Sequence, residues 1–165
     1  MTTLSLSHRV PFRCDNSRIF VKFAVKMDKK RTYNSIERPV YTPDSISALR
    51  PDEVFVFGSN LAGMHGGGAA YAAFKQFGAV MGCGVGLRGQ SYAIPTMQGG
   101  VETIKPYVDE FIAFAKAHPE LFFYVTRIGC GIAGFKDKEI APLFADAVVG
   151  NICLPETFAK VLGCC

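Results

Sequence analysis

The sequence lacks several features that would assign it to a class at once. Its 165 residues contain no tryptophan, and no apolar run approaches the ~18 residues that a membrane-spanning helix needs. The six cysteines form no C-x-x-C pair, so neither a zinc site nor a disulfide scaffold is indicated. With 49% hydrophobic and 19% charged residues, we expect a globular, cytoplasmic protein without membrane contacts, metal ions or cofactors.

The net charge of +4 is unevenly distributed along the chain. Residues 1–26 contain five basic side chains and one acidic side chain, and the remaining residues sum to zero. The basic character therefore does not indicate nucleic-acid binding by the folded part. We interpret residues 1–34 as a basic N-terminal extension that is either disordered or not natively translated, with Met27 as an alternative start. Residues 35–165 are predicted to form a single domain.

Strand and helix patterns alternate from residue 41 onward. A cap at Thr42 or Asp44 predicts a short helix that ends before Pro51. Apolar runs predict strands over residues 53–57, 91–95, 121–128 and 151–154. Helical spacing of apolar residues predicts helices over residues 69–77, 101–117, 138–148 and 156–162. This alternation predicts an α/β fold in which helices cover a mainly parallel sheet.

Glycine is absent before Gly58, and 15 of the 17 glycines lie between Gly58 and Gly134. Glycine is needed where the backbone takes a positive φ or approaches a ligand closely, so this clustering indicates a binding site. No Walker A sequence is present, which disfavours a P-loop NTPase. Two of the glycine-rich segments, residues 58–68 and 129–134, open into predicted helices, whose N-termini favour phosphate groups. Structural turns are the alternative explanation for these loops.

Three segments together resemble a macro domain. They are Val54–Asn60, the run Gly66–Ala70, and the segment Arg127–Phe135, which contains a second glycine loop. The order of strand, asparagine, glycine run, helix, late strand and glycine loop is similar to that of a divergent macro-domain-like group of small bacterial and phage proteins of unknown function. The resemblance covers roughly residues 41–158. It implies a three-layer α/β/α sandwich with a mixed, mainly parallel sheet, which binds ADP-ribose across the strand ends.

The resemblance also implies ligand-binding residues. Asn60 matches the asparagine that addresses the distal ribose, and Phe135 flanks the ribose or adenine side. Gly58-Ser59 stands where macro domains have a small apolar pair, and Asp44 is the nearest candidate for their adenine-binding aspartate. The ligand-binding residues predicted in full are Ser59, Asn60, Gly66, Gly67, Gly68, Arg127, Gly129, Cys130, Gly131, Ile132, Ala133, Gly134 and Phe135.

Four polar or reactive side chains near the loops have chemical potential. Asn60 could orient a water or a ribose hydroxyl, or it could cap its own turn. His65 could act as a general acid or base, or be a solvated loop histidine. Arg127 could pair with phosphate or with a carboxylate of the protein. Cys130 fits a small apolar loop residue better than an activated thiol.

Three functional hypotheses follow from these residues. The first is binding of ADP-ribose or a related nucleotide diphosphate through the two glycine-rich loops. The second is an ADP-ribosyl hydrolase in which Asn60 and His65 position a water as the catalytic residues. The third is a phage or bacterial accessory protein with a vestigial pocket. Binding is favoured because His65 is the only acid–base group expected near the distal ribose.

Overall fold

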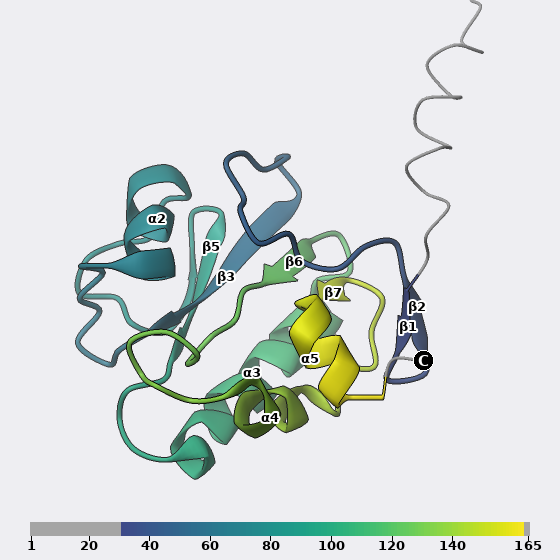
Figure 1. The fold of residues 1–165 in the computed structure, drawn as a ribbon. Coiled ribbons are helices and arrows are strands. Elements are labelled where there is room, and N and C mark those ends of the chain that lie inside the picture. The colour runs from purple at the N-terminus through teal and green to yellow at the C-terminus, as the bar shows by residue number, and fades with distance from the viewer. Residues whose placement is uncertain (1–30, 164–165) are drawn as a thin grey trace, which may run out of the picture.

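The central sheet contains five strands and is mostly parallel, and four of its strands are labelled in Figure 1. The computed structural model describes residues 31–163. Strands β3, β5, β6 and β7 run parallel, whereas β4 pairs antiparallel with β5 at one edge. The spatial order is β4-β5-β3-β6-β7, which confirms the predicted α/β fold with a mixed, mainly parallel sheet. The strands are β3 (Glu53–Ser59), β4 (Gly86–Arg88), β5 (Ser91–Pro95), β6 (Phe122–Val125) and β7 (Ile152–Cys153).

Helices pack on both faces of this sheet. Figure 1 shows α2 standing apart from α3, α4 and α5. Each face has its own apolar core, an arrangement compatible with three layers. Among the described residues, no helix is both long enough and apolar enough to cross a membrane. The helices are α2 (Gly68–Gln76), α3 (Val101–Ala117), α4 (Asp137–Ile140), the 3₁₀ turn η1 (Ala141–Phe144) and α5 (Glu156–Val161).

The alternation of side chains along β3 separates the two cores. Phe55 and Phe57 point to the face covered by α2, where Ala73 is fully buried. Val54 and Val56 point to the opposite face, against the larger core that includes α3 and α5. Every residue of Glu53–Phe57 is buried, because a central parallel strand is covered on both sides. The strand end at residues 58–59 is thereby held rigidly in the middle of the sheet.

A short hairpin precedes the sheet in sequence and packs beside its edge strand β7. It consists of β1 (Arg31–Tyr33) and β2 (Ile36–Arg38). Arg38 is 1% exposed, and its guanidinium donates to the carbonyl of Ile152 in β7. The predicted boundary between residues 34 and 35 therefore falls inside a folded element. The remainder of the predicted extension, residues 1–30, lies outside the described residues.

Two local predictions were wrong, and one strand of the sheet was not predicted. The short helix after Thr42 does not form, because the Thr42 hydroxyl donates to the Cys153 carbonyl and its N–H to that of Leu154. Thr42 therefore lies beside the end of β7 and caps no helix. The helix predicted over residues 138–148 ends early and continues as η1, which begins around Pro142. Strand β4 was not predicted, because its three residues carry no alternation.

Candidate functional site

A cleft of about 490 Å³ opens at the carboxyl edge of the sheet. Its walls come from the end of β3, Met97 after β5, the segment that follows β6 with its glycine loop, and the start of α2. Parallel strands place their carboxyl ends at one edge, where open α/β sheets bind ligands. The lining residues are Gly58, Ser59, Asn60, Met64, Gly66, Gly67, Gly68, Ala69, Ala70, Met97, Thr126, Arg127, Ile128, Gly129, Gly131, Ile132 and Ala133.

Most of the predicted ligand-binding residues lie on this one cleft. The two glycine-rich loops, distant in sequence, face each other: a Cβ built on Gly67 would lie 3.7 Å from Cδ1 of Ile132. The predicted residues found in the lining are Ser59, Asn60, Gly66, Gly67, Gly68, Arg127, Gly129, Gly131, Ile132 and Ala133. The predicted residues that do not line it are His65, Cys130, Gly134 and Phe135. Phe135 instead packs against the larger core.

Both glycine loops line the cleft, and several of their backbone N–H groups make no backbone hydrogen bond among the described residues. Helix α2 begins after Gly67, has no side-chain cap and has no acidic residue in its first turn. Its first N–H groups therefore lack intrahelical acceptors. In the second loop, backbone hydrogen bonds use the N–H groups of Cys130, Gly134 and Phe135. Within the described residues, those of Gly131, Ile132 and Ala133 have no such partner, which leaves donors from both loops for an anion.

Two glycines fix the floor of the cleft. A Cβ on Gly58 would lie 3.2 Å from the backbone nitrogen of Gly129 and 3.3 Å from Oγ1 of Thr96. Gly129 has φ +71°, and a Cβ there would lie 3.1 Å from Cδ1 of Ile140. Glycine at both positions lets the end of β3 touch the second loop directly. The loop is thereby held against the sheet without any intervening side chain.

Among the described residues that line the cleft, Arg127 is the only ionisable one, and it is paired with a carboxylate. Its Nε and Nη2 donate to the two oxygens of Asp137 at 2.9 and 2.7 Å. These hydrogen bonds raise the pKa of Arg127 and lower that of Asp137. Asp137 also accepts a hydrogen bond from the hydroxyl of Thr157. The pair holds the guanidinium at the edge of the cleft in a bidentate geometry.

Cys130 has the character of a neutral loop residue. Burial, together with the neighbouring Asp137 carboxylate, raises the pKa of its thiol to about 11. The thiol lies 3.6 Å from an oxygen of Asp137, toward which it donates. A thiol must ionise to act as a nucleophile, so this environment disfavours covalent catalysis.

Asn60 closes its own loop in this conformation. Its Nδ2 donates to the carbonyl of Met64 at 2.9 Å, and its Oδ1 accepts from the Met64 N–H at 2.9 Å. This is the turn-capping alternative that the sequence left open. The side chain therefore shapes the loop that leads into α2, and both ends of its amide are occupied.

His65 lies in the core rather than on the cleft. It is fully buried, its ring packs edge-on against Phe57, and its Nε2 lies 3.0 Å from the carbonyl of Val80. A carbonyl only accepts, so Nε2 carries the proton. The other ring nitrogen, Nδ1, is buried without a partner. The predicted acid–base role of His65 therefore has no geometric support in this conformation.

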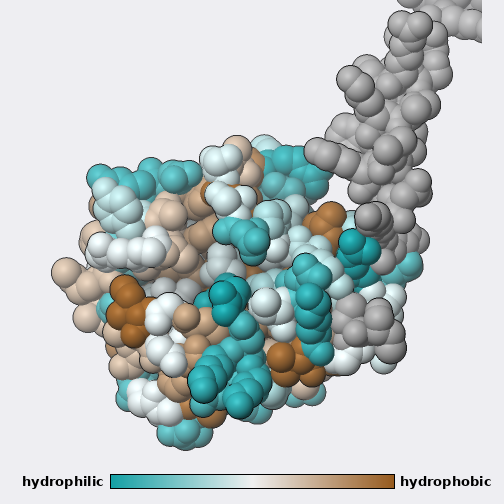
Figure 2. Space-filling model, viewed as in Figure 1, coloured by the Kyte–Doolittle hydropathy of each residue, from teal (hydrophilic) through white to brown (hydrophobic). Residues whose placement is uncertain are grey.

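Sequence reasoning predicted Ile132 but missed the other two exposed large apolar side chains of the lining, Met64 and Met97. Met64, Met97 and Ile132 are 64%, 51% and 79% exposed and contribute large apolar side chains to the cleft. On the face drawn in Figure 2, apolar residues form separate patches among polar ones. Met97 could have been found from its place two residues after a parallel strand, the same position that Arg127 occupies after β6. Met64 has no comparable sequence signal.

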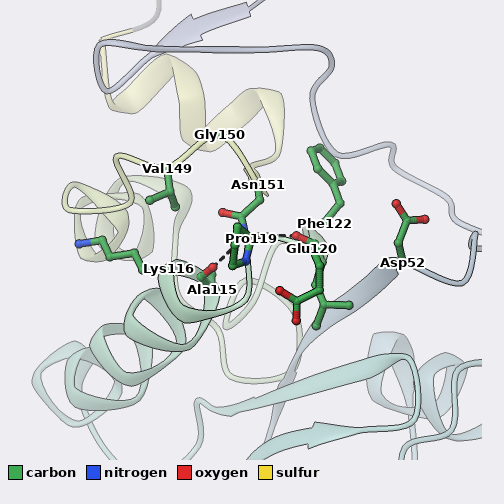
Figure 3. Close-up of a pocket in the computed structure, with 10 residues that line it drawn as sticks. Asp52, Ala115, Lys116, Pro119, Glu120, Phe122, Val149, Gly150 and Asn151 are labelled. Carbon is green, nitrogen blue, oxygen red and sulfur yellow. Dashed lines mark hydrogen bonds between the residues drawn. The ribbon is translucent and has the colours of Figure 1, made fainter.

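A second hollow, of about 520 Å³, lies at the opposite edge of the sheet (Figure 3). Its centre is occupied by Asn151, whose Nδ2 donates to the carbonyls of Ala115, His118 and Leu121. These bonds tie the C-terminus of α3 to the approach to β6. The role of Asn151 is therefore structural, and the hollow lacks the converging donors of the first cleft.

Neither a metal site nor a similar protein provides further evidence of function. Between residues 31 and 163, no group of three or more histidine, cysteine or acidic side chains is placed to hold a metal ion. Comparisons with protein-family models, curated proteins and solved structures find no match. The functional argument therefore depends on the geometry of the cleft.

Proposed function

We propose that this chain binds ADP-ribose or a related nucleoside diphosphate in the cleft at the carboxyl edge of the sheet. The observation that carries the proposal is that the loops around Gly67 and Gly131 line the same cleft. In this proposal the chain is a divergent macro-domain-like protein, built as a three-layer α/β/α sandwich.

The chemistry of the lining suits a diphosphate. Both loops bring backbone N–H groups to the cleft, and the start of α2 adds the positive end of a helix dipole. Arg127 supplies one fixed positive charge, whereas none of the described residues that line the cleft carries a carboxylate. Exposed apolar side chains, Met64 among them, can contact the remainder of a nucleotide. Anionic and apolar parts of one ligand are therefore accommodated side by side.

The positions of Asn60 and His65, the two residues expected to catalyse hydrolysis, favour binding over hydrolysis. The Asn60 amide is engaged by its own loop, and His65 is buried away from the cleft. A positioned water would need a group able to accept its proton. Among the residues lining the cleft, none is a carboxylate or a histidine.

The proposal is tested by thermal unfolding and calorimetric titration with ADP-ribose. Gly131→Glu places a carboxylate in the second loop, where a Cβ meets no atom within 4 Å, so the fold tolerates it and the ligand is repelled. Gly150→Glu is the matched control, because that glycine is equally open and lies away from the cleft. We expect ADP-ribose to raise the melting temperature of the parent protein and of the control but not of Gly131→Glu. Absence of any nucleotide response in the parent protein would refute the proposal.

A further inference from the structure

The polar side chains of the cleft already make hydrogen bonds or ion pairs within the protein. The Ser59 hydroxyl donates to the carbonyl of Gly84, and both ends of the Asn60 amide bond the backbone of Met64. The Thr126 hydroxyl donates to a carbonyl of β3 at 2.8 Å. Of the lining residues that the structure describes, these three and Arg127 are the only ones with polar side chains. Each of the three neutral groups is therefore oriented by the protein, and a base could use only its remaining hydrogen-bonding capacity.

What remains for a ligand is a set of donors that favour negative charge. Arg127 uses Nε and Nη2 for Asp137, and none of the hydrogen bonds among the described residues uses its Nη1. The backbone N–H groups of the two glycine loops are the other available donors. All of them complement phosphate oxygens.

The apolar part of the lining cannot discriminate strongly between bases. Met64 and Met97 are unbranched and flexible, and thioether side chains adapt to differently shaped partners. Apolar pockets separate similar ligands by small factors, whereas large factors arise from buried polar groups that a wrong ligand leaves unpaired. The cleft has the first kind of surface, and its neutral polar side chains are already oriented by bonds within the protein.

We propose that this cleft selects its ligand by the diphosphate and not by the base, so that its substrate class is nucleoside diphosphate sugars in general. The inference rests on the proposed function, because it assumes that a nucleotide occupies the cleft. Arg127 and the loop N–H groups determine the affinity, and the apolar side chains accept a purine or a pyrimidine alike.

The test is calorimetric titration with ligands that share a diphosphate but differ in base. ADP-ribose, UDP-glucose and GDP-mannose are expected to bind with dissociation constants within about fivefold of one another. Adenosine, which has the base but no phosphate, is expected to bind at least about a hundredfold more weakly. Binding of ADP-ribose at least about tenfold more tightly than the other two would overturn the inference while leaving the proposed function intact. If none of the ligands binds, the proposed function itself fails.

Variants locate the source of selectivity. Arg127→Gln is expected to weaken all three diphosphates by a common factor of about ten or more. Lys138→Gln is the control, since it removes a nearby exposed charge that does not line the cleft. A further hollow, of about 340 Å³, is lined by Asp44 and Glu156 among others. An adenine preference that disappears in Asp44→Asn would place base recognition there and overturn the inference.

Discussion

The guanidinium of Arg38 donates from Nε to the carbonyl of Ile152 at 2.6 Å, which joins the N-terminal hairpin to the edge strand β7. Arg38 is 1% exposed and lies over the Tyr33 ring, 4.0 Å from its centroid. Its other hydrogen-bond acceptors among the described residues are also backbone carbonyls, at Tyr33, Ile36 and Ala147. The hairpin is therefore attached through this buried cation, together with hydrogen bonds from Asn34 Nδ2 to the Phe144 carbonyl and from the Leu154 N–H to the Tyr33 hydroxyl.

Replacement of Arg38 by methionine should destabilise the whole domain. Methionine fills much of the space but leaves the buried carbonyls, including that of Ile152, without a donor. We expect the free energy of unfolding to fall by about 3–5 kcal/mol, measured by urea denaturation. Arg88→Met removes an exposed arginine and should change it by less than about 0.5 kcal/mol. Equal effects of the two substitutions would contradict the role assigned to Arg38.

Gly84 should tolerate no side chain. A Cβ there would overlap the carbonyl oxygen of Asn60, at the start of the loop that leads into α2. We expect Gly84→Ala to cost about 1–3 kcal/mol and to weaken ligand binding, because the loop must shift. Gly150→Ala, where a Cβ meets open space, is the control and should change stability by less than about 0.5 kcal/mol. Equal melting temperatures of the two variants would contradict this prediction, because they would show that the loop can shift at no cost in stability.

Stability should decline at alkaline pH through Tyr92. Burial raises the pKa of this tyrosine from 10.0 to about 12, so the folded state retains the phenolic proton longer than the unfolded state. The stabilisation is complete below the unfolded pKa of 10.0 and is lost as the pH rises toward about 12. Over that interval the free energy of unfolding should decrease by about 1.4 kcal/mol per pH unit from this group.

Urea denaturation as a function of pH measures this effect, and Tyr92→Phe supplies the comparison. The variant lacks the titrating hydroxyl, so its stability should decline less steeply over the same interval. If the stability of the parent protein and of Tyr92→Phe declines equally with pH, the assignment to Tyr92 is wrong.

The sequence predicted those elements whose stability comes from local pattern. Helix α3 has the predicted bounds, Val101–Ala117, because its apolar stripe and its stop before Pro119 are both readable locally. The core strand around Val56 was predicted for the same reason, as a continuous apolar run. The cleft was indicated by the position of the glycine loops after parallel strands, a rule of topology that depends on no individual contact.

The errors arose where distant segments decide the structure. Thr42 has the residue type of a helix cap, but its hydrogen bonds go to the end of β7. His65 has the residue type of a catalyst, but the carbonyl of Val80 and the ring of Phe57 hold it in the core. Nothing in the sequence around Arg38 indicates that it is buried, because its hydrogen-bond acceptors are brought to it only by the fold. The groups that contact these three residues are brought to them by the tertiary fold, so the local sequence pattern does not predict the contacts.

The attachment of the hairpin through Arg38 has a consequence for synthesis on the ribosome. The carbonyls that receive the guanidinium include those of Ala147 and Ile152, which leave the exit tunnel long after the hairpin itself. Until then the arginine stays hydrated, and Tyr33 lacks most of the core against which it packs. The earliest part of the described chain is therefore among the last to reach its native environment, and folding of the domain is completed only after translation has passed β7.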